Sequence, residues 1–197
     1  MSGRRADVEI RPLSAATWND FVELFGPDRG ASGGCWCMFW RQPREEWKAR
    51  TRQSNRRKIR RLVTPTSPPG LLAYRDGNPV GWVSIAPRDE FPRLNSSQYL
   101  KPIDRKRVWA VVCFYIRRGH RKSGVASALL AAAVESARTR GARIVEGYPV
   151  ARTQESGDAW TGVPSMFKKA GFKEVERRHP SRPIVRRTLT RSTGRSR

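Results

Sequence analysis

A long apolar segment, RVWAVVCFYI at residues 107–116, runs directly into the polar loop RRGHRKSG and then into small and apolar residues from Val125. An apolar run of this length is typical of a central strand that is buried on both faces of a sheet. The residues from Val125 to Arg140 have the composition of a helix, which Gly141 would end. The chain therefore places a buried strand, a basic loop and a helix N-terminus in direct succession, an arrangement suited to binding a phosphate.

Patterns elsewhere predict further strands and helices around this unit. Asp76-Gly77 between two apolar runs predicts a hairpin over residues 71–87, and alternation predicts an edge strand in residues 7–14. Strands are also expected within residues 142–150, 172–178 and 182–189. Four further helices are expected: one capped by Ser14, one that begins near Pro43, one capped by Ser54, and a short one within residues 163–172. The order β-α-α-β-β-β-α-β-α-β-β, with 88–102 irregular, predicts one α/β domain.

Length and cysteine content limit the class of protein. A chain of 197 residues suits one domain with its own core. We expect no membrane span, because no apolar run approaches the roughly 20 residues that a bilayer requires. No apolar segment follows the basic N-terminus, so no signal peptide is expected. Three cysteines, Cys35, Cys37 and Cys113, cannot all pair, which favours reduced thiols and a cytoplasmic protein.

The net charge of the chain is unusually positive. Forty Lys and Arg against 17 Asp and Glu give a formal charge of +23, which attracts polyanions over long range. Two interpretations stay open: a surface that binds nucleic acid or an anionic cofactor, or the solvated helix faces of an arginine-rich protein. The basic segment RRKIRR at residues 56–61 and the arginine-rich C-terminus favour the first.

Three phosphate-binding patterns can be compared with the loop. A Walker loop has the spacing of Gly119 and Gly124, but Val125 and Ala126 stand where it requires Lys and a hydroxyl residue. A dinucleotide-binding loop requires G-x-G-x-x-G, which this segment lacks. The pattern that remains is Arg121-x-x-Gly124-x-Ala126.

The segment RKSGVA, Arg121 to Ala126, resembles the [QR]-x-x-G-x-[GA] acyl-CoA loop of the GNAT (Gcn5-related N-acetyltransferase) family. SMFKKAGF at residues 165–172 is similar to that family's LYEKxGF segment, and the order of elements matches over nearly the whole chain. The resemblance implies a mixed, mostly antiparallel sheet with helices on both faces, and a splay between the strands of residues 107–116 and 142–150. It implies a GNAT domain over residues 1–190, followed by a basic tail at 191–197.

The same resemblance implies acetyl-CoA or another acyl-CoA as cofactor. The main chain of Phe114 and Ile116 would pair with the pantetheine arm, and amides from Arg121 to Ala126 would bind the pyrophosphate. The basic residues placed to meet the adenosine phosphate are Arg117, Arg118 and Lys122. The residues expected to bind the cofactor are Phe114, Tyr115, Ile116, Arg121, Lys122, Ser123, Gly124, Val125, Ala126, Ser127 and Phe167.

Acyl transfer to an amine needs a neutral amine, a polarised carbonyl and a protonated leaving group, and the amine attacks directly. We predict Glu146 as the base, acting through water, with Tyr148 on the same strand face. The alternative is that Glu146 is a paired structural carboxylate and Tyr148 an aromatic at the edge of the core. Two other carboxylate pairs stay open as bases: Asp89 with Glu90, and Glu155 with Asp158.

The protonation of the leaving group is a separate question. The family often has a tyrosine as general acid where this chain has Phe167, which cannot donate a proton. Tyr148 or Tyr115 would take that role, or the thiolate leaves unaided.

The segment CWCMFW at residues 35–40 combines cysteines and aromatic residues. With only His120 and His179 elsewhere it offers too few ligands at zinc-like spacing, so no metal site is expected. Cys113 could carry an acyl group, but an inert strand cysteine is the simpler interpretation. We expect Trp36, Trp40 and Trp160 to line the acceptor site, with core packing as the alternative for the first two.

The sequence therefore predicts an acyl-CoA-dependent N-acyltransferase, most simply an N-acetyltransferase acting on a small-molecule or peptide amine. The alternative is a protein of the same fold that acts on or with RNA, such as an aminoacyl-tRNA-dependent transferase or a tRNA-binding acyltransferase. We expect an acceptor that is anionic or aromatic, because basic and aromatic surfaces occur together, and a monomer or a homodimer.

Overall fold

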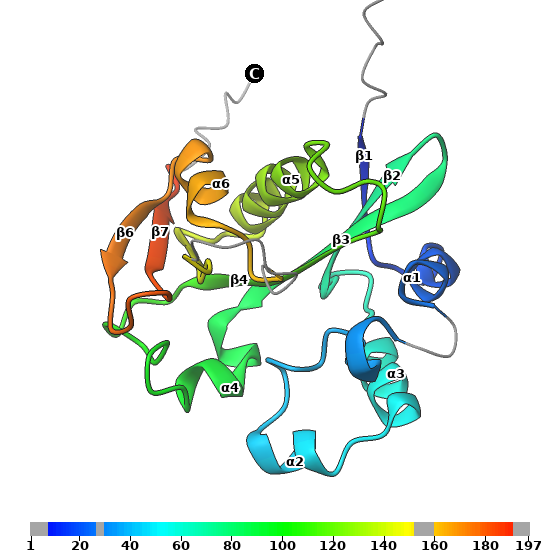
Figure 1. Cartoon of the computed structure of the whole chain (residues 1–197), viewed down its shortest axis with the longest axis horizontal. Coiled ribbons are helices and arrows are strands. Elements are labelled where there is room, and N and C mark those ends of the chain that lie inside the picture. Colours follow the sequence, from blue (N-terminus) through cyan, green and yellow to red (C-terminus); the bar gives the residue numbers. More distant parts are fainter. Residues whose placement is uncertain (1–7, 27–29, 152–159, 191–197) are drawn as a thin grey trace, which may run out of the picture.

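The computed structural model describes residues 8–26, 30–151 and 160–190, which form a seven-stranded sheet covered by helices (Figure 1). The strand order is β1-β2-β3-β4-β5-β7-β6, and neighbours are antiparallel except β4 and β5. This sheet confirms the predicted fold class.

The strands are β1 (Glu9–Pro12), β2 (Gly70–Arg75), β3 (Asn78–Pro87), β4 (Trp109–Ile116), β5 (Ile144–Gly147), β6 (Lys173–Glu176) and β7 (Ile184–Thr188). The helices are α1 (Trp18–Phe25), α2 (Arg44–Lys48), α3 (Arg52–Arg61), α4 (Pro92–Asn95), α5 (Val125–Thr139) and α6 (Pro164–Lys169), with the 3₁₀ turns η1 (Ser32–Gly34) and η2 (Arg88–Glu90).

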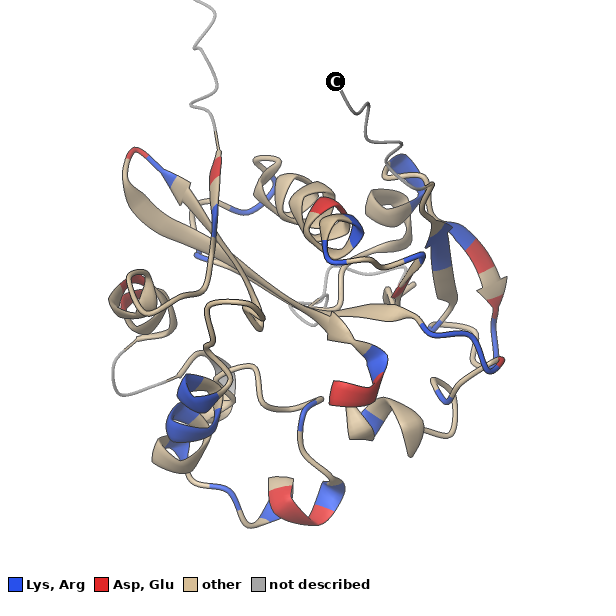
Figure 2. Ribbon diagram, turned by 180° about the vertical axis from the view of Figure 1, so that it is seen from behind, with Lys and Arg blue, Asp and Glu red and all other residues tan. Residues whose placement is uncertain are grey.

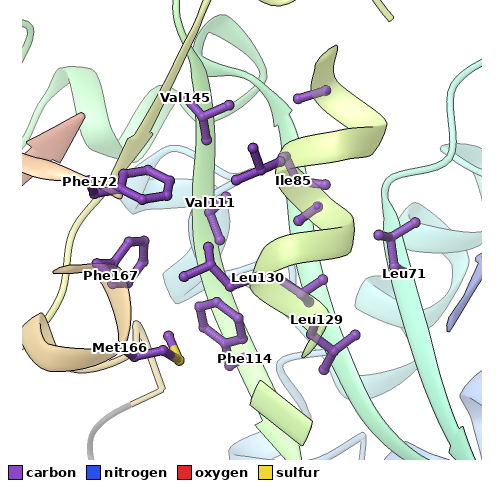
Figure 3. Packing of buried hydrophobic residues seen from close by; sticks show 14 of the residues in the cluster. Leu71, Ile85, Val111, Phe114, Leu129, Leu130, Val145, Met166, Phe167 and Phe172 are labelled. Atoms are coloured by element: carbon purple, nitrogen blue, oxygen red, sulfur yellow. The ribbon is translucent and has the colours of Figure 1, made fainter. Parts of the chain in front are cut away.

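Strand β2 is buried on both faces of the sheet. Leu71 and Ala73 belong to the apolar cluster under α5, whereas Leu72 and Tyr74 belong to the cluster under α1. This alternation follows from the two-residue period of a strand. Figure 3 shows the α5 side of the core, where Leu129 packs over the sheet. The α1 side is mainly aromatic.

The hairpin between β2 and β3 forms as predicted. Asp76 and Gly77 have φ angles of 49° and 76°, and Arg75 pairs with Asn78 across the turn. Positive φ at both central residues defines the type I′ turn, whose twist matches that of the flanking strands. The turn therefore fixes the register of the two strands.

Strand β4 is paired with β5 along only half of its length. The parallel register joins Trp109 with Val145 and Val111 with Gly147, and β5 ends there. Beyond Val111, β4 continues to Ile116 with β3 on its other side. The resulting open edge is the splay that the sequence predicted between these strands.

Several local boundaries differ from the sequence prediction. Helix α3 is capped by Thr51, whose Oγ1 accepts from the Ser54 amide at 3.0 Å, so Ser54 is inside the helix. Helix α1 begins at Trp18, because Ser14 and Thr17 form a turn in which the Thr17 amide donates to Ser14 Oγ. Side-chain bonds to nearby amides compete with helix formation at such residues.

The segment predicted as irregular contains two short helices, η2 and α4. Pro92 begins α4, where the missing amide proton of proline costs no hydrogen bond. Within the described residues, no helix combines the length and hydrophobicity that crossing a membrane requires. The basic tail predicted at 191–197 lies outside the described residues.

Candidate active site

The loop between β4 and α5 exposes a helix N-terminus. Gly124 is the N-cap at a φ of 89°, a left-handed conformation that favours glycine, and a Cβ there would meet nothing within 4 Å. No side chain caps the helix. Among the described residues, the first amide of α5 with a main-chain acceptor is that of Ala128, which donates to Gly124 O at 3.0 Å. The amides of the first turn are thus available to an anion.

Ser123 braces this loop from within. Its Oγ donates to His120 O at 2.6 Å, and Arg75 donates to Ser123 Oγ and O at 3.3 Å each. Lys122 takes a φ of 58°, which costs a residue with a side chain about 1–2 kcal/mol. These contacts hold the loop in a fixed, compact shape ahead of the helix.

A cavity of about 1000 Å³ lies beside the loop and the open edge of β4. It is lined by most of the residues that the sequence predicts for cofactor binding. These are Phe114, Tyr115, Ile116, Arg121, Lys122, Gly124, Val125, Ala126 and Ser127. The structure therefore brings residues of β4 and the first turn of α5 together around one space.

The open edge of β4 has internal partners. The Phe114 amide donates to Trp160 O at 2.6 Å, and Ile116 O accepts from Arg121 Nε at 3.3 Å. A pantetheine arm paired with this edge, as the sequence predicts, would have to replace Trp160 as the acceptor for Phe114. The segment at Trp160 therefore competes with a ligand for the β4 edge.

Ser123, Phe167 and Trp36 do not line the cavity, although the sequence predicts binding roles for them. Phe167 is fully buried and makes edge contacts with Phe114 and Phe172, at 6.3 and 5.0 Å between centroids (Figure 3). Trp36 is 1% exposed and stacks on Phe25. Full burial of such large rings stabilises the core, so the packing alternative describes Trp36, while the cofactor-binding role of Phe167 stays a prediction.

A group of aromatic residues forms another wall of the cavity. Phe39 meets Trp40, Trp47 and Trp160 edge-on at 5.0, 5.1 and 5.3 Å, the geometry favoured by the ring quadrupoles. Trp47 belongs to α2, which lies on the opposite side of the sheet from α5 (Figure 1). The cavity therefore extends past the β4 edge from the α5 side to the α2 side.

The three cysteines all line this cavity as free thiols. Cys37 Sγ lies 3.1 Å from Cys113 Sγ and accepts from Trp82 Nε1 at 2.8 Å. Burial raises the pKa of Cys37 well above its usual value, and burial with the neighbouring Cys37 raises the pKa of Cys35 to about 12. Both thiols are thus protonated at neutral pH. Within the described residues, no group of three or more potential ligands could hold a metal ion.

Glu146 and Tyr148 form a buried ionic cluster outside the cavity lining. Glu146 Oε1 accepts from Arg88 Nη1 at 2.6 Å and from Tyr148 OH at 2.5 Å, while Oε2 accepts from Arg186 Nε at 2.6 Å. Arg186 also binds Asp104. Glu146 is 1% exposed. Burial and the Glu146 charge raise the pKa of Tyr148 well above its usual value, so its hydroxyl keeps the proton.

The catalytic roles of Glu146 and Tyr148 therefore stay predictions. Both carboxylate oxygens of Glu146 are held by arginines, which is the arrangement of the structural alternative. Among the other candidate carboxylates, Glu90 accepts from Arg41 at 2.6 Å and Asp89 is exposed. The pair Glu155 and Asp158 lies outside the described residues.

Sequence reasoning missed Phe39 and Trp47 as cavity residues, as well as His120 in the loop. The density of aromatic residues in CWCMFW was a signal for Phe39, but it did not show which rings face the cavity. Arg117 pairs with Glu23 at 3.0 Å, and its contact with an adenosine phosphate stays a prediction.

An acyl-CoA fits the residues that are present. Its pyrophosphate needs unpaired amides and room for close approach, and Gly124 provides both at the start of α5. A helix N-terminus with available amides beside a splayed, mostly antiparallel sheet matches the site that the sequence predicts for an α/β acyltransferase. A family model described as "Acetyltransferase (GNAT) family" matches residues 34–154. The chain belongs to the GNAT acetyltransferase family, whose members use acetyl-CoA or another acyl-CoA.

Solved structures share the fold at low sequence identity. A GNAT acetyltransferase from Streptococcus pneumoniae matches with a TM-score of 0.55 and 14% identity, over 93% of this chain and 100% of that one. A structure of histone acetyltransferase HPA2 and related acetyltransferase from Corynebacterium glutamicum matches with a TM-score of 0.55 and 17% identity, over 94% of this chain and 98% of that one. The apo form of a mutant agmatine N-acetyltransferase matches with a TM-score of 0.58 and 10% identity, over 93% of this chain and 100% of that one. No curated protein matches the chain.

Proposed function

We propose that this protein transfers an acetyl group from acetyl-CoA to an amine, which attacks the thioester carbonyl directly. The observation that carries this proposal is the cavity shared by the first turn of α5 and by the aromatic wall. One space thus offers an anion site at Gly124 and Val125 and an apolar site at Trp40 and Trp47. A donor with a pyrophosphate and an acceptor with an apolar body can occupy it together.

The donor is held by the chain's own amides in this proposal. The first turn of α5 binds the pyrophosphate, with about half a positive charge from the helix dipole, and Arg121 and Lys122 border the same space. Acetyl-CoA supplies an acyl group that is already activated as a thioester. No nucleophilic side chain is required, which agrees with the protonated Cys35 and Cys37.

The environment of the cavity favours the neutral form of the amine. Apolar rings exclude water, and three arginines, Arg44, Arg50 and Arg93, lie around the aromatic wall. Desolvation and nearby positive charge both lower the pKa of an ammonium group. A base at Glu146, which the sequence predicts, is therefore not needed to remove the proton before attack.

Titration calorimetry with acetyl-CoA tests the donor site. We expect Gly124→Glu to weaken binding at least a hundredfold, because its carboxylate faces the pyrophosphate in a site of low polarity. Two controls separate charge from strain. Gly124→Gln has the same size without the charge, and Gly141→Glu adds the charge at the other end of α5, at a similar φ of 86° with nothing within 4 Å. Equal affinities for wild type and Gly124→Glu would remove the acetyltransferase proposal.

RNA binding is a second candidate function, favoured by the surface of α3. The helix has no acidic residue in its first turn and basic residues along its length, which Figure 2 shows as a blue band. Lys58 pairs with Glu46, whereas Arg57 and Arg61 are exposed and have no carboxylate partner within the described residues. Such a surface suits the phosphates of a polyanion.

Filter binding to tRNA across a salt series tests this second candidate. About six phosphate contacts would lower the affinity roughly a thousandfold between 50 and 200 mM salt. A double variant, Arg57→Gln with Arg61→Gln, should reduce the slope of the salt dependence. No retention of tRNA even at low salt would exclude the candidate.

A further inference from the structure

A second cavity, of about 400 Å³, adjoins the aromatic wall. It is lined by Phe39, Trp40, Arg44, Arg93, Ser96 and Ser97, and its first two residues also line the larger cavity. These shared rings connect the proposed acceptor site to a region rich in arginine and hydroxyl groups.

Two buried donors in this cavity lining have no partner. Trp40 Nε1 and Arg93 Nη2 are both shielded from water, and no described residue accepts a hydrogen bond from either atom. A buried donor without an acceptor is unfavourable, and more so when the group is charged. Trp40 is only 7% exposed, so water does not offset this cost at its indole. The residues that line the cavity thus carry more hydrogen-bond donors than the described residues satisfy.

The positive charge around this cavity is also unbalanced. The Arg93 guanidinium lies over the Phe39 ring at 4.3 Å and the Trp47 ring at 5.6 Å, and Arg50 lies over Trp47 at 3.7 Å. Within the described residues, no carboxylate pairs with Arg44, Arg50 or Arg93. Desolvation lowers the pKa of Arg93, and the charges of Arg44 and Arg50 lower it further. The aromatic faces offset part of this charge, and an anion would offset the rest.

We propose that this cavity is a subsite for an anionic group on the acceptor, so that the substrate is an aryl or apolar amine that also carries a carboxylate or a phosphate-like group. The guanidinium groups of Arg93 and Arg44, which line the cavity, would bind the anion. The amine would reach the larger cavity past Phe39. This inference rests on the proposed acetyltransferase function and defines its acceptor.

Matched amines with acetyl-CoA test the subsite. L-Phenylalanine and phenethylamine differ only in the carboxylate, L-tryptophan and tryptamine do likewise, and 1-amino-2-phenylethylphosphonate replaces the carboxylate with a phosphonate. We expect kcat/KM to be at least tenfold higher for an anionic member than for its uncharged counterpart. The phosphonate arm shows which anion the site prefers. Equal or better turnover of the uncharged amines would overturn the subsite.

Variants assign the preference to named residues. Arg93→Gln and Arg44→Gln should each remove most of the anionic preference, because kcat/KM falls far more for the anionic amine than for its uncharged counterpart. Arg105→Gln, an exposed arginine elsewhere, serves as the control. Equal losses for both members of a pair would contradict the inference.

Binding measured without turnover separates the two proposals. Quenching of tryptophan fluorescence by the amines needs no acetyl-CoA, because Trp40, Trp47 and Trp160 line the cavity. If calorimetry shows no acetyl-CoA binding but quenching favours the anionic amines, the acetyltransferase proposal fails and the subsite stands. If acetyl-CoA binds but quenching shows no anionic preference, the subsite is overturned and the acetyltransferase proposal stands.

Discussion

The two halves of β4 have different neighbours, although both belong to one continuous apolar strand. The first half pairs with β5, and there Glu146 and its two arginines lie outside the lining of both cavities described above. The second half has an open edge, and there the cavity extends from Gly124 to the aromatic wall. The residue types with the most obvious acid–base chemistry lie in the closed half. The cavity beside the open half is lined by glycines and aromatic rings, which have no side-chain group that titrates near neutral pH.

This contrast shows that the presence of a reactive residue type in the sequence is weak evidence for the position of a ligand-binding site. A buried carboxylate requires a partner of opposite charge, and Glu146 forms ion pairs with two arginines, Arg88 and Arg186. An amide at a helix N-terminus is unpaired by geometry, whatever its side chain. The comparison predicts that substitutions in the closed half change stability, whereas those in the open half change ligand binding.

The largest effect is expected for Glu146→Gln in the closed half. Loss of the carboxylate charge leaves Arg88 buried without its counter-charge, which costs about 3–5 kcal/mol, whereas the partly buried Arg186 keeps its pair with Asp104. Chemical denaturation measures this loss. Glu135→Gln is the control, because its pair with Arg138 is on the surface and should contribute less than about 1 kcal/mol. An unchanged unfolding midpoint with a hundredfold lower kcat would instead establish Glu146 as the base.

A smaller effect is expected for Trp47→Ala in the open half. Removing this half-buried ring from the cavity wall should lower kcat/KM for the acceptor about tenfold, since aromatic contacts contribute roughly 0.5–1.5 kcal/mol beyond area burial. The unfolding midpoint and the acetyl-CoA affinity should hardly change. Trp109→Ala, in the closed half, is the matched control and should lower stability without changing the kinetics of the folded enzyme. If Trp47→Ala lowered stability and Trp109→Ala lowered kcat/KM, the contrast between the two halves of β4 would be wrong.

Gly124→Ala should cost about 1 kcal/mol of stability. The methyl group meets nothing within 4 Å, so the cost comes only from the left-handed φ of 89°. Gly141→Ala, at a φ of 86°, should cost about the same, and thermal unfolding measures both. We expect weaker acetyl-CoA binding for Gly124→Ala alone. A similar loss of affinity at Gly141 would show that strain, not position, controls binding.

The smallest change concerns the thiol of Cys35, whose pKa is raised to about 12, chiefly by burial. Below that pH the thiolate fraction rises about tenfold per unit, and only the thiolate is alkylated rapidly. Mass spectrometry after iodoacetamide treatment should therefore find Cys35 unmodified at pH 8 and modified faster as the pH increases. Protein unfolded in guanidinium is the reference for full reaction. Rapid alkylation of the folded protein at pH 8 would contradict the raised pKa.

Much of the fold was predictable because its signals are local. The hairpin at Asp76-Gly77 and the end of α5 just before Gly141 depend on backbone angles that a few residues determine. The boundaries of α1 and α3 were less accurate, since Ser and Thr residues near one another compete for the same amides. The cap at Thr51 is an example.

The candidate site was predictable only in part, for the same reason. The donor end is built from consecutive residues, so the spacing Arg121-x-x-Gly124-x-Ala126 predicted it, and most of these residues line the cavity. The proposed acceptor end joins residues from distant segments. Phe39, Trp47, Arg93 and Trp160 come from α2, from α4 and from two loops, and no local pattern contains the information that they meet.

The sequence by itself determined that this chain forms a splayed α/β sheet and that α5 begins at a glycine with its first amides uncapped, because short-range backbone geometry produces both. The tertiary structure alone decided which side chains are paired and which are not. It buried Glu146 between two arginines and left Arg93 and Trp40 with unpaired donors beside a cavity. The reason is physical: the free energy of a polar group depends on its partners and its access to water, and folding sets both.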